Sequence, residues 1–122
     1  MFESFKAMGM MASLLKDPGK LRDAAEDIRR EAEAMRIAGE AGGGAVRVTV
    51  DGRMRVHEVE FSPALAGALG DDAARAQAEQ MTRQATNDAI DRAQHAMVEV
   101  LNRYAAEFGF PTLPRDLGGF LE

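Results

Sequence analysis

Apolar residues recur along the chain with two different periods, and the change of period marks the predicted elements. From Leu21 to Met35 the apolar positions are four, three, four and three residues apart, which forms a heptad seam between charged positions. With Asp17 as the N-cap before a proline and Gly39 as a C-terminal cap, the seam predicts a helix over residues 18–39. A seam this narrow indicates a helix that leaves most of its surface in water.

After residue 44 the apolar period changes to two. Val46, Val48 and Val50 alternate with polar residues, which predicts a strand with one buried face. The Asp51-Gly52 pair that follows predicts a two-residue hairpin turn, because such turns need positive φ at both central residues.

The return strand is predicted over residues 53–61, so that the hairpin covers residues 45–61. Its apolar positions change parity midway along the strand. One extra residue at His57 or Glu58, a β-bulge, would bring them onto a single face.

Three successive glycines at residues 42–44 invite comparison with phosphate-binding loops. Such loops follow a strand and open a helix, whereas these glycines follow a predicted helix and lead into a predicted strand. A flexible connector is therefore the prediction.

A second apolar stripe predicts a long helix over residues 72–108, ended by Gly109 and Pro111. Its members are Met81, Ala85, Ala89, Ala93, Met97, Leu101, Tyr104 and Phe108. Such a helix is about 54 Å long, whereas a compact domain of this size is a sphere of roughly 35 Å diameter. Since a two-stranded hairpin is marginal in water, paired hairpins of two chains predict a homodimer with protruding helical arms.

The two ends of the chain are predicted to be an amphipathic segment over residues 1–16 and an irregular tail over residues 109–122. The first segment presents Phe5, Met8 and Met11 at helical spacing. It carries too few basic residues for a membrane-surface helix, so packing or contact with a partner is the favoured interpretation.

Composition excludes several classes of function. The 122 residues include no cysteine and two histidines, and the net charge is -5. Disulfides, thiol nucleophiles and cysteine–zinc sites are therefore excluded, and no cofactor is expected. No apolar run approaches the roughly 20 residues of a membrane span. We expect a single cytoplasmic domain over residues 1–122 that contacts no membrane.

No catalytic or metal site is predicted. Neither His57 nor His95 has a nearby serine or cysteine partner. Asp91 and His95 are four residues apart on the last predicted helix, and a hydrogen bond on the helix surface is favoured over a metal site.

Basic residues offer candidate contacts for nucleic-acid phosphates. Arg22, Arg29 and Arg36 repeat every seven residues, which places them along one edge of the first predicted helix. The full set of candidates is Lys20, Arg22, Arg29, Arg30, Arg36, Arg53 and Arg55. Local ion pairs such as Glu26 with Arg30 are the alternative.

Three stretches of the chain occur in an order that resembles the YbaB/EbfC family of nucleoid-associated proteins. They are the glycine-rich joint, strand and turn of residues 39–52, the strand end Val59-Glu60-Phe61-Ser62-Pro63, and Asn87-Asp88-Ala89 in the last helix. The resemblance covers roughly residues 21–94. It departs from the family pattern in a longer connection after Pro63, in Thr86, in Ser62, and in a tail rich in Pro and Leu.

The resemblance implies an α+β fold with the order helix, β-hairpin, long helix, in an intertwined, tweezer-like homodimer with paired hairpins. It also implies a bacterial cytoplasmic protein on the nucleoid that binds duplex DNA through its helical arms with little sequence specificity. The acidic net charge favours an alternative. That alternative is a dimeric module of the same fold with weak or lost DNA binding, which holds a protein partner through Phe5, Met8 and Met11.

Overall fold

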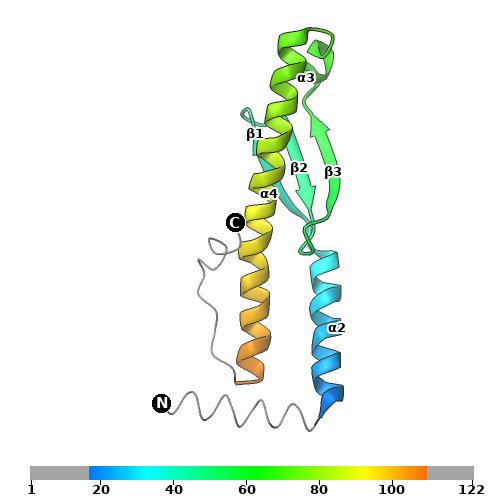
Figure 1. The fold of residues 1–122 in the computed structure, drawn as a ribbon, viewed down its shortest axis with the longest axis vertical. Coiled ribbons are helices and arrows are strands. Elements are labelled where there is room, and N and C mark those ends of the chain that lie inside the picture. The colour runs from blue at the N-terminus through cyan, green and yellow to red at the C-terminus, as the bar shows by residue number, and fades with distance from the viewer. Residues whose placement is uncertain (1–16, 110–122) are drawn as a thin grey trace. The chain divides into compact units, whose positions relative to one another are not determined.

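A computed structural model describes residues 17–109 (Figure 1). The elements in chain order are α2 (Pro18–Ala34), β1 (Ile37–Ala41), β2 (Val46–Val50), β3 (Val56–Phe61), α3 (Pro63–Ala68) and α4 (Asp72–Glu107). The predicted α+β class and its order of helix, hairpin and long helix are confirmed. The predictions for residues 1–16 and for the tail from residue 110 lie outside the described residues.

Two units make up the chain. Of the described residues, the sheet unit comprises 33–94 and the helical unit comprises 17–32 and 95–109. The sheet, α3 and the N-terminal part of α4 therefore belong to the sheet unit, whereas α2 up to Ala32 and the C-terminal part of α4 belong to the helical unit.

The first helix ends earlier than predicted, and a strand that was not expected follows it. α2 stops at Ala34, so the prediction of a helix to Gly39 was wrong. β1 pairs antiparallel with β2, with Ile37 opposite Val50. Gly39 caps no helix but lies in the middle of β1, where a Cβ would sit 2.3 Å from the Ala89 nitrogen of α4. Glycine is needed there because the strand approaches the helix backbone directly.

The three glycines join two strands. The prediction of a connector between a helix and a strand was wrong, because residues 42–44 turn the chain from β1 into β2. All three glycines have positive φ, between 64° and 93°. That conformation explains why this turn is built from glycine.

The bulge was predicted correctly, and the turn beside it was not. Thr49 pairs with Glu58 and Val50 with Val56, so His57 is the extra residue of β3. The turn runs through residues 51–55, and its positive φ of 65° falls on Met54 rather than on Gly52. β3 begins at Val56, so the return strand does not start at residue 53 as predicted.

The core of the sheet unit lies between α4 and the strands β1 and β2. Val46, Val48 and Val50 are fully buried against small side chains of α4, namely Ala85, Ala89 and Ala93. These three alanines were predicted members of the long stripe. Small residues on the helix let it lie close to the sheet.

Ser62 and Thr86, two residues that depart from the family pattern, each make a local hydrogen bond. Ser62 is the N-cap of α3 and accepts a hydrogen bond from the Leu65 amide at 3.2 Å. The Thr86 hydroxyl donates to the Thr82 carbonyl at 2.7 Å, so its polar atom is paired within α4.

The predicted apolar seam of α2 is only partly correct. Ala24 and Ala32 are buried, whereas Leu21 is 50% exposed and Ala25 is exposed as well. On α4, Leu101 of the predicted stripe is also exposed. Within the described residues, α2 and α4 together therefore do not bury the whole predicted seam of α2.

Candidate nucleic-acid interface

The basic residues of α2 are largely matched by acidic ones. The helix carries four basic and five acidic residues. Arg29 and Arg30 both reach Glu26, at 3.8 and 3.5 Å. The pair between Glu26 and Arg30 was the predicted local alternative to phosphate contact. Because these pairs are exposed to solvent, they hold the arginines only weakly.

Lys20 and Arg22 lie near the start of α2 and are exposed. The Lys20 backbone amide donates to Asp17 Oδ1 at 3.4 Å, which confirms Asp17 in the N-cap role. No ion pair involves the side chains of Lys20 or Arg22 within residues 17–109.

Arg36 does not continue the line of Arg22 and Arg29 along a helix, because α2 ends two residues before it. Its guanidinium folds back on the chain and donates to the carbonyls of Glu33 and Met35, at 2.8 and 2.7 Å. Arg36 therefore caps the exposed carbonyls where the helix ends. The expected seven-residue row of arginines on one helix was wrong at this position.

Arg53 and Arg55 lie in the turn before β3, not on a strand face. The Arg53 guanidinium pairs with Glu33 Oε1 at 3.0 Å, which ties the turn to the C-terminal end of α2. For Arg55, the side chain is exposed and makes no ion pair among the described residues.

Asp51 organises this turn. Its Oδ1 accepts hydrogen bonds from the Arg53 and Arg55 amides, at 2.8 and 3.2 Å, and its Oδ2 lies 2.8 Å from His57 Nε2. The side chain is 3% exposed. The hydrogen bond with His57, helped by the two backbone amides, lowers the pKa of Asp51 from 3.8 to about 2 against the opposing effect of burial.

Sequence reasoning identified Asp51 as a turn residue and missed its role as the anchor. An aspartate that begins a turn commonly accepts hydrogen bonds from the amides that follow it. That signal was present in the Asp51-Gly52 pair. Glu33 was missed too, because nothing in the sequence indicates that it meets a residue 20 positions later.

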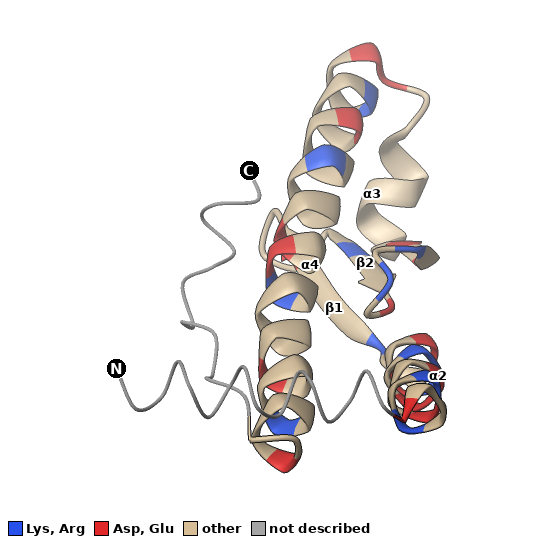
Figure 2. Ribbon diagram, turned by 60° about the horizontal axis from the view of Figure 1, so that its bottom comes forward, with Lys and Arg blue, Asp and Glu red and all other residues tan. Residues whose placement is uncertain are grey.

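Charge is distributed unevenly among the elements. α4 carries four basic and six acidic residues, and the two signs alternate along it (Figure 2). From residue 35 to residue 57, by contrast, there are four arginines and two acidic residues. The local excess of positive charge therefore lies in the sheet unit rather than on either long helix.

In the helical unit, the end of α4 is joined to α2 by polar contacts. Arg103 pairs with Glu31, and the Tyr104 hydroxyl donates to the same carboxylate at 3.4 Å. The Arg103 guanidinium also lies 5.6 Å from the centroid of the Tyr104 ring. These contacts engage Arg103 in the fold.

Asn87 and Asp88 lie in the middle of α4. Asp88 Oδ2 accepts a hydrogen bond from the Glu40 amide of β1 at 3.2 Å. Its other oxygen lies 3.3 Å from Arg92. Asp88 therefore fixes the edge of β1 against α4.

Residues 17–109 contain no group of three or more acidic, histidine or cysteine side chains suited to hold a metal ion. Within the same residues, no helix combines the length and the apolar character that crossing a bilayer requires. Phe5, Met8 and Met11, the predicted contacts of a protein partner, lie outside the described residues.

Two relatives match this chain, one over about half of it and one over most of it. A nucleoid-associated protein of Synechococcus sp. (strain JA-2-3B'a(2-13)) is 38% identical over 63 residues, which are 52% of this chain and 57% of that protein. The chain thus spans less than two thirds of this relative's length.

A nucleoid-associated protein of Legionella pneumophila (strain Corby) is 26% identical over 102 residues, which are 84% of this chain and 87% of that protein. The YbaB/EbfC DNA-binding family matches the chain over residues 8–108. Because every described helix and strand lies inside that match, the chain belongs to the YbaB/EbfC DNA-binding family.

Proposed function

We propose that the protein is a non-catalytic, nucleoid-associated protein of the bacterial cytoplasm that binds duplex DNA with little sequence preference. The observation that carries this proposal is the family match over residues 8–108, which includes every described element. The names of the relatives from Synechococcus and Legionella agree with it.

A homodimer is part of the proposal, and β3 supports it. Val56, Val59 and Phe61 pair with the three buried valines of β2 and so share their face of the sheet. They are nevertheless 49%, 47% and 39% exposed. α4 covers β1 and β2 on this face and leaves β3 uncovered (Figure 1).

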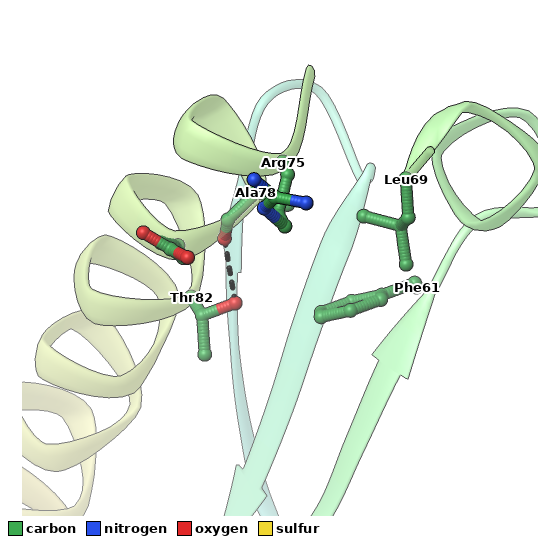
Figure 3. A pocket seen from close by; sticks show the side chains of 6 residues that line it. Phe61, Leu69, Arg75, Ala78 and Thr82 are labelled. Atoms are coloured by element: carbon green, nitrogen blue, oxygen red, sulfur yellow. Dashed lines mark hydrogen bonds between the residues drawn. The ribbon is translucent and has the colours of Figure 1, made fainter. Parts of the chain in front are cut away.

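A groove continues the exposed apolar strip of β3, which is formed by Val56, Val59 and Phe61. It has a volume of about 410 Å³ and is lined by Phe61, Leu69, Arg75, Ala78, Glu79 and Thr82. Phe61 and Leu69 lie next to each other on one side of it, opposite Arg75, Ala78 and Thr82 of α4, and the Thr82 hydroxyl is turned to the Ala78 carbonyl (Figure 3). Contiguous apolar surface of this kind marks a protein interface. A second copy of the sheet unit is the occupant that we propose.

Pairing of two copies would also cover β3, which is an exposed edge strand of the sheet. β1 is held at the other edge by α4 through Asp88 and Gly39. An uncovered edge with apolar side chains invites association with another strand or sheet. The dimer would also double each basic patch, which strengthens attraction to phosphates.

The basic side chains proposed to contact phosphates are those predicted from the sequence, which are Lys20, Arg22, Arg29, Arg30, Arg36, Arg53 and Arg55. All seven residues are exposed. Exposed cations bind phosphates without reading bases, so they supply affinity rather than specificity.

DNA binding is tested by fluorescence anisotropy with a labelled duplex across roughly 50 to 200 mM salt. We expect binding that weakens steeply with salt, with a log–log slope of several units, because counterions are released from phosphates. Absence of binding at the lowest salt would reject the proposal and favour the alternative of a dimeric protein-interaction module.

A further inference from the structure

One basic residue just after α2 and three basic or titratable residues of the β2–β3 turn and β3 are connected through two acidic residues. We call Arg36, Arg53, Arg55 and His57 the turn cluster. Glu33 links the first two, since its carbonyl accepts from Arg36 and its carboxylate pairs with Arg53. Asp51 links the others through the Arg55 amide and His57 Nε2.

The two acidic residues of this arrangement, Asp51 and Glu33, already have partners within the fold. Asp51 is buried, and its carboxylate is hydrogen-bonded to two backbone amides and to the His57 imidazole. These contacts hold the turn. Glu33 pairs with Arg53 at a site where both side chains are more than 40% exposed. An exposed pair of this kind is weak enough for a phosphate to replace the carboxylate.

The backbone of the turn is held in an uncommon conformation. Met54 has φ of 65°, which is the left-handed region that residues with a side chain rarely adopt. Met54 also packs against the core cluster of the sheet unit. The strain is therefore maintained by surrounding contacts, and such positions concentrate at functional sites.

From these observations we infer that the turn cluster, rather than the cations of α2, is the main phosphate-contact point. The inference rests on the proposed DNA binding and names the site within it. Phosphate would meet guanidinium groups carried by a fixed turn, where little backbone freedom remains to be lost.

The test compares two double variants that remove the same charge. Arg53→Gln/Arg55→Gln alters the turn cluster, and Arg22→Gln/Arg29→Gln is the matched control on α2. Each full-length protein is titrated against a labelled 30-base-pair duplex of arbitrary sequence by anisotropy, after circular dichroism and sedimentation have shown an unchanged fold and oligomeric state.

We expect the turn variant to bind about tenfold more weakly and to lower the salt slope by roughly 2, one unit for each lost phosphate contact. The α2 variant should change affinity by less than about threefold. Equal losses in both variants, or wild-type affinity in the turn variant, would overturn the inference while DNA binding itself stands. Failure of the wild-type protein to bind would reject both.

Discussion

Gly39 of β1 lies directly on the backbone of Ala89 in α4, so close that no side chain fits between them. A Cβ on Gly39 would be 2.3 Å from the Ala89 nitrogen and 2.4 Å from the Ala85 carbonyl oxygen. Both obstacles are backbone atoms, which cannot move aside as a flexible side chain could. The contact sets the distance between the sheet and the helix.

Gly39→Ala should therefore lower the free energy of unfolding by about 3 kcal/mol, at the upper end of the usual cost of overpacking. Denaturation with urea measures the loss. Gly67→Ala in α3 is the matched control, since nothing lies within 4 Å of the added carbon. That control should be neutral or stabilising by up to about 1 kcal/mol. Similar behaviour of the two variants would show that the close approach is absent.

Asp88→Ala should cost about 1 kcal/mol, because the Glu40 amide loses its acceptor at the edge of β1. Asp88→Asn keeps an oxygen acceptor and should lie close to the wild type. Arg92→Ala removes only the exposed ion pair with Asp88 and should change stability by less than about 0.5 kcal/mol. The amide proton of Glu40 should exchange faster in Asp88→Ala alone. If Asp88→Asn loses as much as Asp88→Ala, the hydrogen bond is not the cause.

Acid should destabilise the sheet unit through Asp51. Its pKa is about 2 in the folded protein and 3.8 ordinarily. The unfolded chain therefore binds more protons between these values, so the stabilisation is present above about pH 4 and is lost as the pH falls toward 2. Urea denaturation at several pH values measures this loss.

Asp51→Asn provides the comparison for the acid prediction. The amide side chain does not titrate, so the variant should be less stable than the wild type near neutral pH. The difference between the two proteins should shrink as the pH falls from 4 to 2. A constant difference across this range would mean that Asp51 does not hold the lowered pKa.

Val59→Lys should convert the proposed dimer into a monomer, because the charge would be buried in the strip on β3. Val59 is 47% exposed within one chain, so folding of the monomer should change little. Glu60→Lys is the control, since Glu60 pairs with Arg47 and faces the other side of the sheet. Sedimentation equilibrium separates the outcomes. A Val59→Lys protein that remains dimeric would place the interface elsewhere.

Local sequence signals predicted those elements in which pattern and packing agree. The alternation at Val46, Val48 and Val50 predicted β2, and the parity change predicted the bulge at His57. The long stripe predicted α4, with its three core alanines. For β2 and α4 the residues that form the core are residues that define the period, whereas the apolar residues of β3 that revealed the bulge are exposed in the single chain.

The strand β1 was missed because its sequence, Ile-Ala-Gly-Glu-Ala, has little preference for a strand. It is a strand because β2 supplies its hydrogen-bond partners and α4 accepts Gly39 against its backbone. The same glycine was interpreted as a helix cap, since a cap and a close approach both require the absence of a side chain.

The sequence by itself determined the order of helix, hairpin and long helix, the bulge, the basic residues and the family. Only the tertiary structure decided which of those residues meet. It placed Glu33 beside Arg53, put Arg36 on the carbonyls at the end of α2, and left β3 exposed beside a covered β2. The physical reason is distance along the chain: periodicity reports on neighbours within a few residues, whereas these relationships join residues that only folding brings together.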